Sequence, residues 1–272
     1  MTSTEPGRTA ASHQERDVPV RGSRVRVLHA GSGPPLLYLH SAGDPGLWMP
    51  VLAELATRYT VYRPDHPGFN ASEDRPEIGS VHDLAFFYLD LLDELGLDQV
   101  VLIGSSLGGW LAADLATIEP RRVSKLVLAG AAGLRAEGTV PDVFQLSPVE
   151  LAELTYHTSG ARSAAVAEAE RVEQDAERFG QYLRNRSATA HLGWNPYLHD
   201  PALPHRLHRI AAPALIMWGA HDRLLPAGCA RRWAELLPSA QLTIIEDAGH
   251  HPLAEQPDAA LEALWPFLRK ER

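Results

Sequence analysis

The sequence is poor in the residues and runs that mark secreted or membrane-spanning proteins. Among 272 residues only Cys229 is a cysteine, so the chain forms no internal disulfide, as is typical of a reducing compartment. Residues 1–18 lack the apolar core of a signal peptide, and no apolar run approaches the ~20 residues that cross a bilayer. We therefore expect a cytoplasmic protein.

Positive charge is also scarce. Lysine and arginine together number 25, against 34 aspartates and glutamates, which gives a formal net charge of −9. Such a chain offers no basic surface to displace phosphate counterions, which argues against nucleic acids and anionic membranes as partners. The expected partner is a small-molecule substrate, and the composition leaves the oligomeric state open.

Motifs for metals and phosphate groups are missing as well. His205 and His208 lie close together, but there is no helix with two histidines and a glutamate, and no cysteine pair. The glycine-rich stretch Gly104–Gly109 lacks the lysine of a phosphate-binding loop. The sequence therefore predicts neither a metal site nor a cofactor.

What the sequence does contain is a regular alternation of short β-rich runs and longer helical stretches. The expected strands are Arg24–Leu28, Leu36–Leu39, Thr60–Tyr62, Gln99–Ile103, Lys125–Leu128, Ala214–Trp218 and Leu242–Ile245. The expected helices between them are Trp48–Thr57, Val81–Leu95, Ser106–Ile118, Gly228–Leu237 and Pro257–Lys270. This alternation predicts an α/β fold with a mostly parallel central sheet flanked by helices.

One segment, residues 134–207, interrupts the alternation. It has no convincing strand, and Pro148–Tyr156 and Ser163–Arg186 are expected to be helices. Because the segment leaves after one strand of a parallel sheet and returns before the next, we expect a cap over the strand ends; packing elsewhere on the core is the alternative. The predicted division is a disordered tail over 1–19, a core over 20–133 and 208–272, and a helical cap over 134–207.

The stretch Gly-Ser-Ser-Leu-Gly-Gly, residues 104–109, lies between an apolar run and an amphipathic stretch. Only one register fits the pattern Gly-x-Ser-x-Gly, and it makes Ser106 the central residue. At a sharp strand-to-helix corner, small flanking residues let the chain pass its neighbours without a clash. We predict that Ser106 is a nucleophile at this corner, and that Ser105 points back toward the sheet, where its hydroxyl satisfies a backbone group.

A serine hydroxyl needs a base, and the base needs an acid to orient it. His250 follows the last expected strand and is the predicted general base, while its neighbour His251 is expected to line the rim of the site. Asp222 lies just beyond the preceding strand and is the predicted acid. The chain order Ser106, Asp222, His250 is the one expected on this kind of sheet.

The predicted donors for an oxyanion are two backbone N–H groups. Leu107 begins the helix after Ser106, and Ala42 lies in the loop after the strand Leu36–Leu39, a loop that His40 is expected to hold by hydrogen bonds. A mostly apolar substrate pocket is expected, with core packing as the alternative for each aromatic residue. Its predicted lining residues are Ser41, Trp48, Phe144, Trp194, Leu224 and His251.

Taken together, these motifs resemble the α/β-hydrolase superfamily over residues 20–268. The segments that carry the resemblance are His40–Gly43, Asp65–Phe69, Gly104–Gly109, Trp218–Asp222 and Ala248–His250. The resemblance implies a capped serine hydrolase, similar to esterases, lactonases and the hydrolases that cleave carbon-carbon bonds in ring-fission products.

At a few positions this sequence differs from particular subfamilies, and these differences argue against their activities. The carbon-carbon hydrolases typically carry an asparagine before the nucleophile and a tryptophan after the catalytic histidine, whereas this sequence has Ser105 and His251 there. Epoxide hydrolases and haloalkane dehalogenases carry an aspartate where this chain has Ser106. Hydroxynitrile lyases use a lysine near the catalytic histidine, and the only lysines here are Lys125 and Lys270.

The expected function is hydrolysis of a small-molecule ester or lactone through an acyl-enzyme on Ser106. Two alternatives stay open: a carbon-carbon bond hydrolase acting on ring-fission diketone products, and a ligand-sensing protein on the same scaffold. An enzyme is favoured because a pure binder has no need of a nucleophile, base, acid and oxyanion donors together. The sequence leaves the natural substrate, the acyl chain length and the stereoselectivity open.

Overall fold

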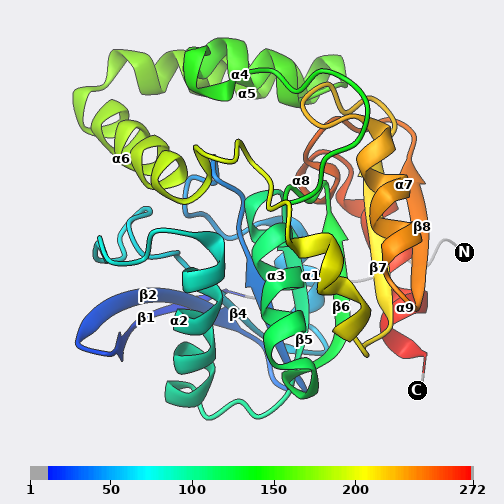
Figure 1. Ribbon diagram of the computed structural model, residues 1–272. Coiled ribbons are helices and arrows are strands. Elements are labelled where there is room, and N and C mark those ends of the chain that lie inside the picture. Colours follow the sequence, from blue (N-terminus) through cyan, green and yellow to red (C-terminus); the bar gives the residue numbers. More distant parts are fainter. Residues whose placement is uncertain (1–11, 271–272) are drawn as a thin grey trace, which may run out of the picture.

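The computed structural model describes residues 12–270, whose centre is an eight-stranded sheet (Figure 1). The strands are β1 (Gln14–Val20), β2 (Ser23–Ala30), β3 (Pro35–Leu39), β4 (Thr60–Pro64), β5 (Val100–Ser105), β6 (Val123–Ala129), β7 (Ala214–Gly219) and β8 (Ala240–Ile245). Their order in the sheet is β1-β2-β4-β3-β5-β6-β7-β8. The pairings among β3 to β8 are parallel, and the antiparallel pairings are those of β1 with β2 and of β2 with β4. The predicted α/β class with a mostly parallel sheet is confirmed.

Helices cover both faces of this sheet. One face carries α2 (Val81–Glu94), α3 (Leu107–Ile118) and α7 (Ala227–Leu236), and the other carries α1 (Pro50–Leu55), α8 (Pro252–Glu255) and α9 (Pro257–Arg269). The segment between β6 and β7 holds α4 (Pro148–Thr155), α5 (Ser159–Gln174) and α6 (Ala176–Gly193). Short 3-10 helices are η1 (Pro120–Arg122), η2 (Val143–Gln145), η3 (Leu203–His205) and η4 (Leu207–Arg209).

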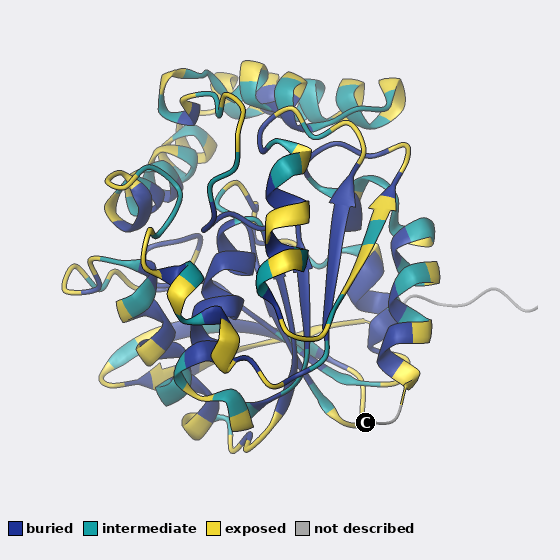
Figure 2. Cartoon of the chain, turned by 45° about the vertical axis from the view of Figure 1, so that its right-hand side comes forward, coloured by how far each residue is buried: buried dark blue, intermediate teal, exposed yellow. Residues whose placement is uncertain are grey.

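The core consists of two apolar layers, one on each face of the sheet. All residues of β5 and β7 are buried, as expected for strands covered on both sides (Figure 2). Successive side chains of a strand point to opposite faces, so Leu102 packs in the layer under α2 and α3, and Ile103 packs in the layer under α1 and α9. This arrangement holds the strand ends rigidly in register at the edge where the candidate site lies.

The prediction of a disordered tail over residues 1–19 is wrong for its second part. Residues 14–20 form β1, which pairs with β2 from Gln14↔His29 to Val20↔Ser23. Along β1 only Val18 and Val20 are buried, because the strand lies at the sheet edge and its polar side chains face solvent. That polarity gave the segment the composition of a tail. Residues 1–11 lie outside the described part of the chain, and the core therefore begins at β1 rather than at residue 20.

Within the insertion, residues 134–207, the helices α4, α5 and α6 are drawn in Figure 1 above the carboxyl ends of the parallel strands, whereas its last part, with η3, runs down beside α3. The single helix expected over Ser163–Arg186 is two helices, α5 and α6. They separate at Asp175, whose side chain accepts the N–H groups of Glu177 and Arg178 and so caps the start of α6. An N-cap aspartate inside an alanine- and glutamate-rich stretch is a weak signal, which explains the error.

Hydrogen bonds connect the insertion to the core at two places. On α6, the Arg184 guanidinium donates to the backbone carbonyls of Asn70 and Ser72 in the loop after β4. At the end of α4, the carbonyl of Thr155 accepts the N–H of His250 at 2.7 Å. The insertion therefore contacts the loop that carries the predicted base.

Candidate active site

The predicted nucleophile lies at a strained corner between β5 and α3. Ser106 has φ 51° and ψ −112°, a conformation that non-glycine residues adopt rarely and at an energetic cost. A Cβ on Gly104 would lie 2.2 Å from the Gly108 carbonyl oxygen, and one on Gly108 would lie 2.1 Å from the Leu39 carbonyl oxygen. The glycines are therefore required by close backbone approach, and the corner lifts the Ser106 side chain to the end of the sheet.

The structure brings the three predicted side chains into one hydrogen-bonded chain. Ser106 Oγ lies 2.9 Å from His250 Nε2, and His250 Nδ1 lies 2.9 Å from Asp222 Oδ2. His250 and Asp222 are almost fully buried, each with 1% of the side chain exposed. Since a carboxylate only accepts, the Nδ1 of His250 donates, and the Nε2 of the neutral ring is free to accept the Ser106 proton.

The backbone of the loop after β7 fixes the orientation of the Asp222 carboxylate. Its Oδ1 accepts the N–H groups of Leu224 and Leu225, each at 2.9 Å, and this leaves Oδ2 for His250. The carboxylate is thus saturated by fixed donors, as a group that orients an imidazole must be.

The loop after β3 carries the predicted oxyanion donor Ala42 and is held by two stacked histidines. His40 Nε2 accepts the N–H of His66 at 2.9 Å, so the ring carries its proton on Nδ1, which donates to the Ser41 carbonyl at 2.7 Å. Within residues 12–270, no hydrogen bond is found from the N–H of Ala42 or from that of Leu107. Both predicted donors are therefore unengaged within this part of the chain.

The two histidines are neutral, because burial lowers the pKa of His40 to about 3 and lowers that of His66 well below its usual value. An unfolded histidine has a pKa near 6.5. The depressed folded-state pKa therefore means that His40 contributes stability above about pH 6.5, and that this contribution is lost as the pH falls toward about 3.

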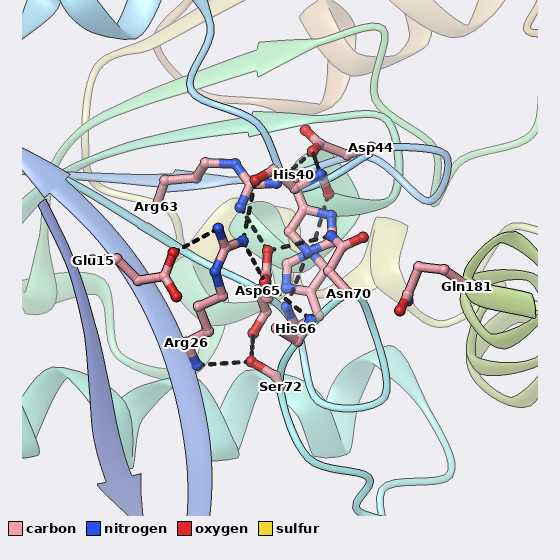
Figure 3. Close-up of polar contacts among 12 residues, drawn as sticks. Glu15, Arg26, His40, Asp44, Arg63, Asp65, His66, Asn70, Ser72 and Gln181 are labelled. Atoms are coloured by element: carbon pink, nitrogen blue, oxygen red, sulfur yellow. Dashed lines mark hydrogen bonds and ion pairs between the residues drawn. The ribbon is translucent and has the colours of Figure 1, made fainter. Parts of the chain in front are cut away.

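Behind this loop lies a chain of buried charges (Figure 3). The guanidinium of Arg63, which is fully buried, contacts the carboxylates of both Asp44 and Asp65. Burial alone would lower the pKa of Arg63 and raise that of Asp65, but the ion pairs outweigh burial and shift both in the opposite directions. Asp65 also pairs with Arg26, at 3.1 Å.

One carboxylate links the insertion to the predicted base. Glu255 in α8 accepts the N–H groups of His157 and Thr158 with Oε1, at 2.8 and 2.6 Å. Its Oε2 accepts the N–H of Gly249, the residue before His250, at 2.7 Å. Sequence reasoning missed Glu255, because nothing in the local pattern indicates that its partners come from a distant loop.

A small cavity of ≈ 70 Å³ lies beside the site, and two of the six predicted pocket residues, Ser41 and His251, line it. Its full lining is Tyr38, Ser41, Gly43, Asp44, Pro45, Met49, Ser105, Tyr156, His251, Leu253 and Ala254. Sequence reasoning missed Asp44 and the two tyrosines. Asp44 follows directly on the Ala42 loop, a position that could have drawn attention to it. Ser105 is the last residue of β5 and lines the cavity together with Tyr38, and no hydrogen bond from its hydroxyl to a backbone group is found among the described residues.

The other four predicted pocket residues are not part of the lining of this cavity. Trp48 stacks on His13 with 5.3 Å between ring centroids. Phe144 packs against Trp194 at 5.2 Å, and Trp194 is 60% exposed at the end of α6. Leu224 packs in the core layer under α2 and α3, and its part in the site is the backbone N–H that it donates to Asp222.

Comparison with known proteins assigns the chain to a family. The family model described as the alpha/beta hydrolase fold matches residues 34–257. The chain belongs to the α/β-hydrolase family. An uncharacterised protein of Mycobacterium tuberculosis is 28% identical over 280 residues, covering 92% of this chain and 79% of the relative. The 2-hydroxymuconate semialdehyde hydrolase of Pseudomonas sp. (strain CF600) is 28% identical over 263 residues, covering 86% and 87%.

Solved structures of α/β-hydrolases share the fold. The 2-hydroxy-6-oxo-6-phenylhexa-2,4-dienoate hydrolase of Rhodococcus sp. (strain RHA1) superposes with a TM-score of 0.80 at 24% identity, covering 96% of this chain and 100% of the other. A carboxylesterase of Bacillus subtilis gives a TM-score of 0.75 at 24% identity, covering 96% and 93%. Esterases and carbon-carbon hydrolases are thus both structural neighbours, and the chain is an α/β-hydrolase enzyme by family.

None of the helices between residues 12 and 270 combines the length and the apolar character that crossing a membrane requires.

Proposed function

We propose that this α/β-hydrolase is a serine hydrolase that cleaves a small-molecule ester or lactone through an acyl-enzyme on Ser106. The observation that carries the proposal is the chain of two 2.9 Å contacts from Ser106 Oγ through the His250 ring to Asp222 Oδ2. A buried, correctly oriented imidazole is what a serine hydroxyl needs to become a nucleophile at neutral pH.

In the proposed reaction, Ser106 Oγ attacks the carbonyl carbon while His250 Nε2 takes the hydroxyl proton. The oxyanion that forms accepts hydrogen bonds from the N–H groups of Leu107 and Ala42, where each donor contributes about 100- to 1000-fold to the rate. His250 then donates the proton to the leaving alcohol. Water, deprotonated by the same nitrogen, attacks the acyl-enzyme and releases the acid and Ser106.

Cleavage of a carbon-carbon bond is the second candidate, because relatives 28% identical to this chain include hydrolases named for ring-fission products. Two residues count against it. Ser105 and His251 stand where such hydrolases typically carry asparagine and tryptophan, and both line the cavity beside the site. Ligand sensing without turnover is the third candidate. It is disfavoured because a protein that only binds a ligand has no need of the hydrogen bonds that connect Ser106, His250 and Asp222.

The test is a panel of chromogenic esters, lactones and ring-fission dienes, assayed on the wild type and on Ser106→Ala. Ser239→Ala is the matched control, since this serine is exposed and precedes β8, at the opposite end of the parallel strands from Ser106. We expect esters or lactones to be hydrolysed, with a loss of at least about 1000-fold in Ser106→Ala and none in the control. Turnover of the dienes alone would favour the second candidate. Ligand binding without any turnover would favour sensing, and hydrolysis unaffected by Ser106→Ala would refute the proposal.

A further inference from the structure

Three of the residues that line the cavity of ≈ 70 Å³ are sequence neighbours of the predicted reacting groups. Ser41 precedes the predicted oxyanion donor Ala42, Ser105 precedes the nucleophile, and His251 follows the base, with 4.8 Å between the two histidine ring centroids. A cavity of this size holds a group of a few non-hydrogen atoms, or a small number of water molecules. A group attached close to the scissile carbonyl is therefore the part of a substrate that this cavity can receive.

Asp44 is the only residue of the lining with a formally charged side chain at neutral pH. Burial, with Asp44 nearby, raises the pKa of Tyr38 and of Tyr156, so both phenols stay protonated. Desolvation and the neighbouring His250 lower the pKa of His251 to about 3, so that ring is neutral. The other polar lining groups are serine hydroxyls.

The Asp44 carboxylate is buried but only half satisfied. Its side chain is 5% exposed, and its Oδ1 receives both of its hydrogen bonds, from Arg63 and from the N–H of Gly46. No described residue donates to Oδ2. Asp44 Oδ2 is not among the fully buried polar atoms that lack a partner, so it keeps some accessible surface and can accept a hydrogen bond from a ligand in the cavity.

The ion pairs behind Asp44 engage its Oδ1 and leave its Oδ2 without a cationic partner among the described residues. Ion pairs run from Glu15 through Arg26, Asp65 and Arg63 to Asp44 (Figure 3), so three carboxylates alternate with two guanidinium groups. The excess negative charge of this chain lies with Glu15, whose side chain is 54% exposed, because the largely buried Arg26, Asp65, Arg63 and Asp44 cancel one another. At the cavity itself, Asp44 is the only formally charged group of the lining, and a positively charged donor is therefore favoured there and a carboxylate disfavoured.

We propose that this cavity, which we call the Asp44 pocket, binds a primary ammonium group that the substrate carries close to its scissile carbonyl. The inference builds on the proposed ester hydrolysis and names the substrate class as amino-substituted esters. It also gives a physical reason against the dienoate substrates of the carbon-carbon hydrolases, whose carboxylate would meet Asp44 instead of a donor.

The test uses a series of 4-nitrophenyl esters whose acyl groups differ only in one terminal group. That group is ammonium, hydroxyl, methyl or carboxylate, separated from the carbonyl by one or by two methylene groups. Each kcat/KM is divided by the rate of spontaneous hydrolysis of the same ester, which removes differences in intrinsic reactivity. The proteins compared are the wild type, Asp44→Asn, and Glu262→Gln, a control that removes an exposed carboxylate of α9.

In the wild type we expect the ammonium ester to exceed the methyl ester by about 10- to 100-fold, and the carboxylate ester to fall below the methyl ester. Asp44→Asn should abolish the preference for ammonium, while Glu262→Gln keeps it. If Asp44→Asn fails to fold, the ratios of kcat/KM between the ammonium, methyl and carboxylate esters in the wild type still test the Asp44 pocket. Ser106-dependent cleavage of the methyl ester with no advantage for ammonium would overturn the Asp44 pocket alone. If no ester of the series is cleaved in a Ser106-dependent manner, the proposed function and this inference both fail.

Discussion

Replacing Asp222 by asparagine tests the geometry of the site more sharply than removing the side chain. In the structure, Oδ1 of Asp222 accepts two backbone N–H groups, from Leu224 and Leu225. An asparagine keeps these bonds only if its amide oxygen takes the place of Oδ1. Its NH₂ group then faces His250 Nδ1 and donates to it, so the neutral ring must move its proton to Nε2. That nitrogen then no longer accepts the Ser106 proton.

The expected size of the effect follows from this tautomer change. Fixing a triad histidine in the wrong tautomer lowers kcat by about 10⁴-fold, with the fold intact. Stability should change little, by about 1 kcal/mol, because both backbone hydrogen bonds survive and only the bond to His250 changes its direction. The account therefore predicts a folded, nearly inactive protein.

The assay combines kcat for the best ester of the panel with urea unfolding of the same preparation. Asp247→Asn is the matched control, since Asp247 is an exposed aspartate three residues before His250. It should keep its activity within about 2-fold of the wild type. An Asp222→Asn protein that retains more than about a tenth of the wild-type kcat would refute the reasoning, because its histidine would still be accepting from Ser106.

Three further predictions concern the elements that hold the site. Gly108→Ala should lower the free energy of unfolding by about 1–3 kcal/mol or more, because its Cβ meets the backbone of a neighbouring segment. Gly160→Ala has open space around its Cβ and should leave the free energy of unfolding unchanged or raise it. Equal free energies of urea unfolding for the two variants would contradict this reasoning. Between pH 7 and pH 5 the free energy of unfolding should fall, and His40 alone should account for about 2 kcal/mol of that fall. The His40→Asn variant should lack this contribution, whereas the variant of the exposed His208, His208→Asn, should keep it. An equal fall in both variants would be inconsistent with a buried neutral His40. Glu255→Ala should lower kcat more than it raises KM, because the N–H of Gly249 loses its acceptor and Gly249 directly precedes the predicted base His250. Glu255→Gln should recover part of the rate. A change in KM alone would argue against this positioning role of Glu255.

The sequence predicted the central sheet well, because strands buried on both faces read as continuous apolar runs between helical stretches. It failed for β1, whose polar edge-strand residues look like a tail, and for the break between α5 and α6 at Asp175. Both failures have the same cause. These segments are defined by a partner strand or by a single cap, and neither leaves a strong periodic pattern in the sequence.

The three residues predicted to meet, Ser106, Asp222 and His250, were accessible to sequence reasoning because each follows directly on a strand of a parallel sheet. The carboxyl ends of such strands converge at one edge, and the structure brings the side chains into contact there. Their catalytic roles remain a prediction.

The cavity lining was not accessible in the same way. Asp44 and Tyr156 come from a loop and from the end of α4, and only tertiary packing places them together. Trp194 was expected to line the pocket because it is aromatic and lies in an irregular stretch, yet its ring lies largely in solvent against Phe144.

The central claim is that Ser106 is an activated nucleophile, and covalent labelling tests it most directly. The protein is treated with an alkyl fluorophosphonate, which phosphonylates activated serines, and the modified residue is identified by peptide mass spectrometry. The account predicts a single adduct on Ser106, absent in Ser106→Ala and formed far more slowly in Asp222→Asn. A folded wild-type protein that stays unlabelled, or that carries the adduct on another residue with Ser106 unmodified, would contradict it.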